Sequence, residues 1–453
     1  MTRSSRNPAI GNQAPALPQA PMHSPGAPAA RHTTRTPAQR PSAGRRAGPR
    51  IALALAGGGP LGAIYEIGAL CALEHSLRGL DLRRLHHYVG VSAGAFIAAG
   101  LANGISMRDL YAAFIEEAPL DGIDFRPARL MRPAYDEFLR RAARWPALLA
   151  GACWQVTAGR QSLTQVLERL GAGLPTGVFS NHAIEARLAA LFQRAGRSND
   201  FRQLDTRLTV VATNLDTGEA APFGNPGWDQ VPISQAIQAS SALPGLYPPV
   251  MIDGRYYVDG ALKKTLHATV ALDQGVDLML CLNPLVPFDA HTPLAARVMQ
   301  RGRSKAERRI PRIVEGGLPA VLSQTFRSMI HSRMALGMKH YAHAYPATDI
   351  VLIEPDHRDP ELYLANTFSY RHRRRLAEHA FQQTRRMLRS DASGLAEKLA
   401  RHGITLDHAA LADPQAHLGA PRQRVGRLGG ALTTLQDTLD GMDQLLARHR
   451  AAA

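Results

Sequence analysis

Short apolar runs alternate with longer segments of helical spacing along most of the chain. The first run, residues 51–56, consists only of Ile, Leu and Ala and lies between Arg50 and Gly57, which is typical of a strand buried on both faces. Large apolar residues then recur every three or four positions over 60–75 and predict a helix. Further strands are predicted at 88–91, 208–213, 278–282 and 350–353, and further helices at 93–102, 182–193, 233–240 and 371–389. This alternation predicts an α/β fold with a largely parallel sheet.

Both ends of the chain differ from this pattern. Residues 1–50 contain nine prolines, eight arginines, no acidic residue and no Phe, Tyr or Trp. Such a segment cannot bury enough apolar surface to fold, so we expect a disordered tail over 1–48. A helical extension is predicted at 391–453, where apolar residues from Val425 to Leu446 follow a heptad pattern. This helix either packs on its own domain or pairs with a second chain to form a homo-oligomer.

Composition narrows the class of protein. Apolar residues make up 45% and charged residues 20% of the 453 positions, which indicates a globular protein rather than a fibrous or wholly disordered one. The longest apolar stretch, 93–102, is far shorter than the roughly 18 residues of a membrane-spanning helix. Cys71, Cys153 and Cys281 are isolated, so neither a disulfide framework nor a thiolate zinc site is encoded. We therefore expect a cytoplasmic protein that is soluble or peripheral at a membrane.

The net charge of +16 comes almost entirely from arginine, since only five of the 53 basic residues are lysines. Half of this charge lies in residues 1–50, and further arginines gather in 371–375 and in 290–348, which we interpret as a helical insertion over the sheet. Binding to an anionic membrane surface and codon usage explain this bias equally well. No basic motif with interleaved aromatic residues is present, so no specific nucleic-acid partner is expected.

A glycine-rich loop, Gly57-Gly-Gly-Pro-Leu-Gly62, joins the first strand to the first helix. Glycines permit a tight turn with accessible backbone N–H groups, and the helix N-terminus adds partial positive charge, so a negative group is expected nearby. Gly57, Gly59 and Gly62 also satisfy the dinucleotide pattern G-x-G-x-x-G, with Asp81 about 20 residues further on. In a Rossmann unit, however, the acid closes the second strand, whereas here the next strand ends at Val91.

The segment Gly90-Val-Ser-Ala-Gly94 has the pattern G-x-S-x-G at the junction of a predicted strand and a predicted helix. A sharp turn there lifts a serine hydroxyl clear of the backbone and directs the following N–H to the same place, which requires small flanking residues. An ordinary helix cap is the alternative for the bare pattern. The flanking elements and the glycine loop favour a nucleophile, so Ser92 is the candidate.

A catalytic serine requires a base. The late histidines stand in no distinctive context, and they are His331, His340, His343, His357, His372 and His379. A short run rich in Tyr and Val, 256–258, instead leads to Asp259 and Gly260. Because Asp-Gly is also the commonest hairpin signal, Asp259 is either a base or part of an ordinary turn.

Taken in order, these blocks resemble the patatin-like phospholipases, which pair a G-G-G-x-[Arg/Lys]-G loop with a G-x-S-x-G elbow and a later Asp-Gly. The segment 239–249, rich in Ser, Ala and Pro, also resembles a block that this family has upstream of its Asp. The resemblance covers about residues 49–390, which would form a hydrolase domain. It departs at Leu61, where the family usually has a cation, and at Ala261, where a further glycine often follows the Asp.

The resemblance implies a three-layer α/β/α fold and a Ser-Asp dyad that works without histidine, metal or cofactor. Ser92 would be the nucleophile and Asp259 the general base in hydrolysis of a phospholipid or another acyl ester through an acyl-enzyme. The implied oxyanion hole consists of N–H groups of Gly57, Gly58, Gly59 and Ala93, and the supporting turns contain Gly62, Gly90, Gly94 and Gly260. Two alternatives stay open, a dinucleotide-binding oxidoreductase based on the glycine loop and a non-catalytic membrane or assembly module based on the basic clusters and the heptads.

Overall fold

The computed structural model describes residues 48–125, 132–134, 176–289, 313–363, 372–390 and 394–418. The chain divides into two units, Met1–Gly48 and Pro49–Ala453, and every feature described below lies in the second. The predicted tail up to residue 47, the arginine cluster at 297–312 and the heptad segment at 425–446 lie outside the described residues. Within the described ranges, no helix combines the length and apolar character that crossing a bilayer requires.

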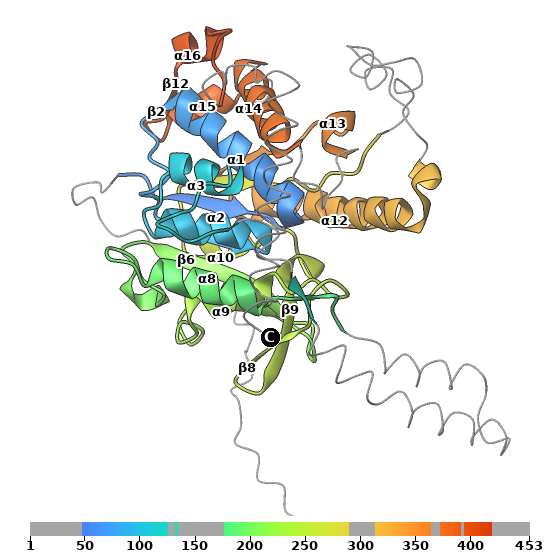
Figure 1. The fold of residues 1–453 in the computed structure, drawn as a ribbon. Helices are drawn as coiled ribbons and strands as arrows, with labels where there is room; N and C mark the ends of the chain where they lie inside the picture. Colours follow the sequence, from blue (N-terminus) through green and yellow to red (C-terminus); the bar gives the residue numbers. More distant parts are fainter. Residues whose placement is uncertain are drawn as a thin grey trace, which may run out of the picture. The chain divides into compact units, whose positions relative to one another are not determined.

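A mixed eight-stranded sheet forms the centre of the second unit (Figure 1). Its five parallel strands lie in the order β11 (Asp349–Ile353), β10 (Leu278–Leu282), β1 (Ile51–Leu55), β3 (His87–Val91) and β6 (Arg207–Asn214). Three antiparallel strands complete it beyond β6, namely β7 (Ala220–Phe223), β9 (Arg255–Asp259) and β8 (Val250–Ile252). The expectation of a largely parallel sheet is confirmed.

Helices cover both faces of this sheet. One layer contains α1 (Gly59–Ser76), α2 (Ala93–Ala102), α3 (Met107–Phe114), α8 (His182–Phe192), α9 (Ile233–Ser240) and α14 (Arg373–Ser390). The other contains α10 (Thr269–Leu272) and the 28-residue helix α12 (Gly317–Ala344). The shorter elements are β2 (Leu77–Arg78), β4 (Arg132–Pro133), β5 (Phe179–Ser180), β12 (Thr405–Leu406), η1 (Phe201–Gln203), η2 (Gly260–Leu262), η3 (Ile313–Gly316), α13 (Pro360–Tyr363), α15 (Leu395–Ala400) and α16 (His408–Ala412).

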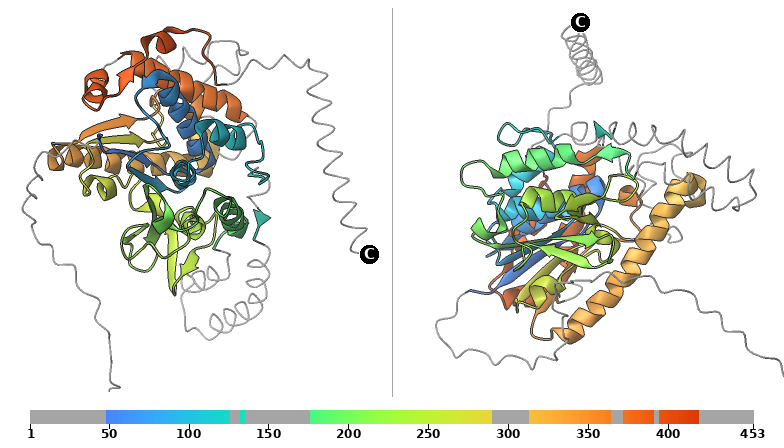
Figure 2. Two further views of the ribbon diagram at one scale, coloured as in Figure 1. Left: turned by 90° about the vertical axis from the view of Figure 1, so that its left-hand side faces the viewer. Right: turned by 90° about the horizontal axis from the view of Figure 1, so that it is seen from below.

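Alternate residues of the central strands belong to two separate apolar cores. In β1, Leu53 and Leu55 pack in the core that includes α1, α2, α9 and α14. Ala52 and Ala54 point to the opposite face, where they share a second core with Met334 of α12. This period of two is the geometry of a strand that is buried on both faces. The sheet therefore lies between two helical layers, as the views in Figure 2 show, and the predicted three-layer architecture is confirmed.

The predicted strands and helices match the observed ones closely, and the main differences lie at the antiparallel edge of the sheet. There β8 has only three residues, too few for a periodic pattern, and it pairs with β9 through a turn in which Asp253 and Gly254 both have positive φ angles, 48° and 75°. Two positive φ angles are typical of a two-residue hairpin turn. The hairpin is thus made by this Asp-Gly pair, whereas Asp259 and Gly260 lie at the other end of β9.

Candidate active site

Ser92 occupies a sharp turn between β3 and α2. Its backbone has φ 51° and ψ −121°, a conformation that non-glycine residues rarely adopt. Its two flanking glycines are required by close packing, since a Cβ at Gly90 would lie 2.5 Å from the Cα of Ala95 and a Cβ at Gly94 would lie 2.6 Å from the carbonyl oxygen of Leu55. The predicted strand, serine turn and helix are therefore present, and the G-x-S-x-G spacing has a steric reason.

Ser240 holds this turn from the neighbouring part of the fold. The backbone N–H of Ser92 donates to Oγ of Ser240 at 2.8 Å, and that hydroxyl donates in turn to the carbonyl oxygen of Val211 at 2.6 Å. Ser240 is the last residue of α9 and is fully buried. The sequence analysis assigned it no role, although it stands within the Ser- and Ala-rich block at 239–249.

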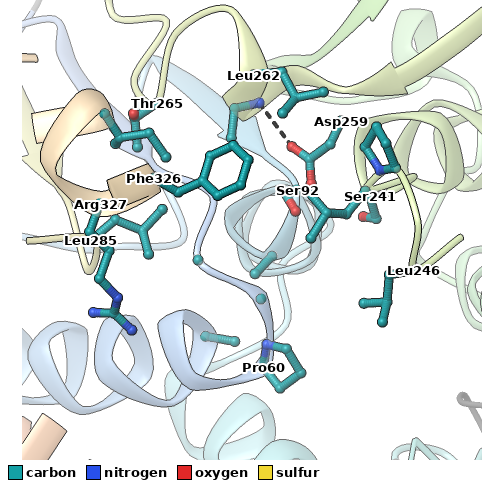
Figure 3. Close-up of a pocket in the computed structure, with 18 of the residues that line it drawn as sticks. Pro60, Ser92, Ser241, Leu246, Asp259, Leu262, Thr265, Leu285, Phe326 and Arg327 are labelled. Carbon is teal, nitrogen blue, oxygen red and sulfur yellow. Dashed lines mark hydrogen bonds between the residues drawn. The ribbon is translucent and has the colours of Figure 1, made fainter. Parts of the chain in front are cut away.

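Asp259 ends β9 and lies beside Ser92 (Figure 3). Its carboxylate lies next to the Ser92 hydroxyl, and its Oδ1 accepts a hydrogen bond from the N–H of Ala261 at 2.8 Å. The next residue must be glycine, because a Cβ at Gly260 would lie 2.2 Å from the carbonyl oxygen of Val211. The sequence thus left two interpretations of this dipeptide, and the geometry favours a site residue over a hairpin turn.

Burial controls the ionisation of Asp259. The residue is 3% exposed, and desolvation raises the pKa of its carboxyl group to about 6, although the neighbouring Ser92 hydroxyl and the N–H of Ala261 act in the opposite direction. A carboxylate with such a pKa is ionised at neutral pH and is a stronger base than an exposed one. Asp259 is therefore suited to exchange a proton with the hydroxyl that it contacts.

The glycine-rich loop passes directly over the serine turn. A Cβ at Gly57 would lie 3.1 Å from the Cβ of Ser92, and one at Gly58 would lie 2.7 Å from Pro284 and 2.8 Å from the Cα of Gly62. The loop runs into α1, which begins at Gly59, while α2 begins at Ala93. The first N–H groups of a helix have no partner within it and carry its positive dipole end, so both helices provide donors beside Ser92.

The fold does not place an acidic residue where dinucleotide binding requires one, at the end of the second strand. After α1 the chain enters β2, which pairs with β12 in a separate two-stranded sheet before the chain reaches β3. Asp81 follows β2, and its carboxylate accepts hydrogen bonds from the backbone and the guanidinium of Arg83. It therefore does not stand at the carboxyl end of a strand of the main sheet, where a ribose would be bound.

A cavity of about 430 Å³ opens onto the Ser92 hydroxyl and the Asp259 carboxylate. Much of its wall is apolar, with contributions from Phe96, Phe114, Ile184, Leu246, Leu285 and Phe326. Four cationic side chains also line it, namely Lys263, Lys264, Arg327 and Arg333. Asp259 is the one carboxylate among the described residues of the lining. The cavity therefore combines a long apolar surface with positive charge.

No histidine belongs to the described lining of this cavity. Of the six late histidines, His331 and His357 contact each other, His379 pairs with Asp359 and Glu361, and the remaining three are exposed. One histidine that the sequence analysis did not consider, His267, is buried with Nε2 3.4 Å from the carbonyl oxygen of Gly260. Burial lowers the pKa of His267 to about 4, which favours a neutral ring that supports the turn after Asp259.

Comparison with known proteins gives one family match and several similar structures. Residues 53–272 match the family model described as Patatin-like phospholipase. Among solved structures, VipD from Legionella pneumophila is 17% identical with a TM-score of 0.33, and the match covers 76% of this chain and 67% of VipD. The type III effector protein ExoU is 16% identical with a TM-score of 0.30, and the match covers 76% of this chain and 53% of that one. The third structure is the complex of SpcU with ExoU from Pseudomonas aeruginosa, which is 15% identical with a TM-score of 0.27. This match covers 78% of this chain and 58% of that one.

The chain thus spans little more than half of the two ExoU chains, and TM-scores this low carry no argument about function. The family match carries more weight because its range contains the glycine loop, the serine turn and Asp259. Residues 53–272, a little under half of this chain, are thus similar to the patatin-like phospholipase family.

Proposed function

We propose that this chain is a serine lipid acyl hydrolase, which cleaves carboxylic ester bonds of phospholipids or other acyl lipids through a Ser-Asp dyad. The observation that carries the proposal is that the Ser92 hydroxyl and the buried Asp259 carboxylate lie side by side at the wall of an apolar cavity (Figure 3). The family match of residues 53–272 supports the same reaction class. A general base beside a nucleophile that a substrate can reach through a cavity is the minimal arrangement for acyl transfer.

In the first half of the proposed reaction, Ser92 forms an ester with the acyl group. Its oxygen attacks the substrate carbonyl carbon while Asp259 accepts the hydroxyl proton. The resulting oxyanion accepts hydrogen bonds from N–H groups of the loop 57–59 and of Ala93, which begins α2. The C–O bond of the tetrahedral intermediate then breaks, and protonated Asp259 returns its proton to the departing alkoxide.

In the second half, water releases the acyl group. Asp259 accepts a proton from a water molecule, whose oxygen attacks the acyl-enzyme carbonyl. The same backbone N–H groups stabilise the second oxyanion, and collapse of the intermediate releases the fatty acid while the Ser92 oxygen regains its proton. No metal or cofactor takes part in this sequence of steps.

The lining of the cavity favours a phospholipid over a neutral ester. Its apolar wall matches an acyl chain, and Lys263, Lys264, Arg327 and Arg333 match a phosphate group. Leu61 stands where the patatin-like phospholipases usually have a cation. Leu61 is buried, however, and the positive charge of the cavity comes in equal number from Lys263 and Lys264 and from Arg327 and Arg333 of α12.

A substrate panel tests this proposal. Purified chain is incubated with p-nitrophenyl esters of increasing chain length, with labelled phosphatidylcholine and phosphatidylglycerol, and with a neutral triacylglycerol. We expect released fatty acid in all active reactions, and higher kcat/KM for the phospholipids than for the triacylglycerol. An absence of hydrolysis of every ester by folded protein contradicts the proposed function, and equal turnover of phospholipid and triacylglycerol contradicts the substrate class.

Activity should depend on pH through Asp259. The base acts in its ionised form, and its pKa is raised to about 6, so kcat/KM on a soluble ester is expected to rise with pH through about 6 and to reach a plateau near neutrality. At pH 5 the rate should be about tenfold below the plateau, because one pKa unit corresponds to a factor of ten in ionised fraction. His267→Gln serves as the control and should leave this inflection in place. A profile that is flat from pH 5 to 8 rules out Asp259 as the titrating base.

We also propose that the chain docks on anionic membranes with the cavity mouth toward the lipid. Phe326 and Met329 of α12 line the cavity and are about half exposed, and the exposed apolar residues Leu318 and Leu322 precede them on the same helix. Apolar residues can insert at the headgroup level, while nearby cations such as Arg333 are attracted to anionic lipid.

This docking proposal predicts a selective defect. Leu318→Ser combined with Leu322→Ser should lower co-sedimentation with vesicles that contain phosphatidylglycerol, and leave kcat/KM on a soluble short-chain ester unchanged. Leu336→Ser provides the matched control, since Leu336 is 66% exposed on the same helix and lies about four helical turns beyond Leu322. Binding should also weaken as salt rises, and deletion of residues 1–48 should remove part of it because seven arginines are lost. Equal binding of neutral and anionic vesicles by all these proteins would contradict the proposal.

A further inference from the structure

Three potential metal ligands meet where α12 crosses the carboxyl ends of the parallel strands. His331 comes from α12, and Glu354 and His357 come from the segment that follows β11. One ligand atom from each residue lies within 4.8 Å of the other two. The two imidazole rings are nearly perpendicular with centroids 4.6 Å apart, and Oε1 of Glu354 lies 3.8 Å from Nε2 of His357.

Two further observations indicate that this cluster is more than an ion pair. Nδ1 of His331 is buried and has no hydrogen-bond partner within the described part of the chain. A buried polar atom normally has a partner, and a bound metal ion would supply one. Oε2 of Glu354 accepts a hydrogen bond from the amide of Asn283 at 3.3 Å, and Asn283 is fully buried directly after β10. Outer hydrogen bonds of this kind orient the carboxylates that bind metals.

We propose that His331, Glu354 and His357 bind a divalent transition-metal ion of the zinc type. Two imidazoles and one carboxylate are a donor set that zinc prefers, whereas calcium and magnesium prefer oxygen ligands alone. The ligand atoms need to move together by only about 1 Å to reach the separations of a tetrahedral zinc site, in which zinc–ligand distances are about 2.0–2.2 Å. Three protein ligands leave a fourth position for water.

The metal ion would fix a wall of the cavity. Ile330 and Arg333 flank His331 along α12 and line the cavity, so a bond from His331 to the segment after β11 ties this helix to the end of the sheet. The ion holds the helix and takes no part in the acyl-transfer steps. The sequence analysis excluded only a thiolate zinc site, and its expectation of no metal came from the family resemblance. The separation of His331 from the other two residues hides the site in the sequence.

Zinc binding by purified full-length chain tests the proposal. The protein is prepared without a polyhistidine tag, stripped with a chelator and titrated with zinc chloride by calorimetry, and its zinc content after gel filtration is measured by mass spectrometry. We expect one zinc ion per chain and a higher Tm in its presence. His331→Ala and His357→Ala should each weaken binding by at least about tenfold, because losing even an outer contact costs 10- to 100-fold. His340→Ala is the matched control, since His340 is exposed on the same helix, and it should bind zinc as tightly as wild type.

Each outcome decides the question separately from the hydrolase activity. Wild-type protein that binds no zinc, or a folded His331→Ala variant that binds it as tightly as wild type, overturns the proposal. If the substitutions prevent folding, cobalt replaces zinc in the wild-type protein. An intense visible absorption then supports a four-coordinate site, and the weak spectrum of hydrated cobalt overturns it. Loss of ester hydrolysis has no bearing on any of these measurements.

Discussion

Ser92→Ala and Asp259→Asn are each expected to lower kcat for ester hydrolysis by roughly 10⁴- to 10⁶-fold, the range seen when members of a serine catalytic unit are removed. The reason is that the proposed nucleophile and base share one proton, so neither is effective without the other. The kcat of the double variant should be no lower than that of the less active single variant, because losses within one catalytic unit are not additive. Single-turnover and steady-state rates on a soluble short-chain ester measure these effects without the influence of membrane docking.

The fold of both variants must remain intact for this comparison. Asp259 is nearly fully buried with its pKa raised from 3.8 to about 6, so the stability it contributes is fully present below about pH 4 and is lost as pH rises through about 6. A shift of two pKa units corresponds to about 3 kcal/mol of folding free energy, which the ionised carboxylate costs the wild type at pH 8. Asn has no charge to bury, so Asp259→Asn should have a Tm no lower than wild type at this pH.

Histidine variants provide the second control. His379→Ala and His267→Gln should retain most of the activity, because neither residue lines the cavity. If one of these substitutions in a folded protein were as damaging as Ser92→Ala, the dyad would have to be replaced by a triad.

Gly58→Val is expected to lower kcat by at least 10²- to 10³-fold, the cost of losing one oxyanion donor. A Cβ at this position lies 2.7 Å from Pro284 and 2.8 Å from the Cα of Gly62, so the loop must shift and its N–H groups must turn away from Ser92. KM should change less than kcat, since the donors bind the oxyanion more tightly than the ground-state carbonyl. Steady-state kinetics with circular dichroism as a check on folding measure the effect.

Gly337→Val is the matched substitution for this experiment. Gly337 lies within α12 and outside the cavity lining, and a Cβ there has 3.8 Å to its nearest neighbour, the ring of Tyr341. This variant should keep nearly full activity. A wild-type kcat for Gly58→Val would contradict the assignment of the loop to the oxyanion hole.

Local sequence determined most of the parallel half of the fold. The runs at 51–56 and 278–282 are apolar on both faces, so they have no stable place except in the middle of a covered sheet, and both became central strands. The serine turn was equally predictable, because the glycines at 90 and 94 permit one close-packed geometry between a strand and a helix. Short-range sterics and hydrophobic periodicity are encoded residue by residue, which is why these features could be predicted.

Tertiary structure decided everything that depends on residues far apart in the chain. Asp259 became a partner of Ser92, and not a hairpin residue, because β9 pairs antiparallel with β6 and ends beside the serine turn. Packing of α9 against β6 brings Ser240 under the turn, and burial of the Asp259 carboxylate raises its pKa. Packing of α12 across the sheet creates the cationic side of the cavity and the meeting of His331 with Glu354. The burial and the charge of these sites depend on neighbours that come from distant segments of the chain. No local pattern in the sequence therefore predicts them.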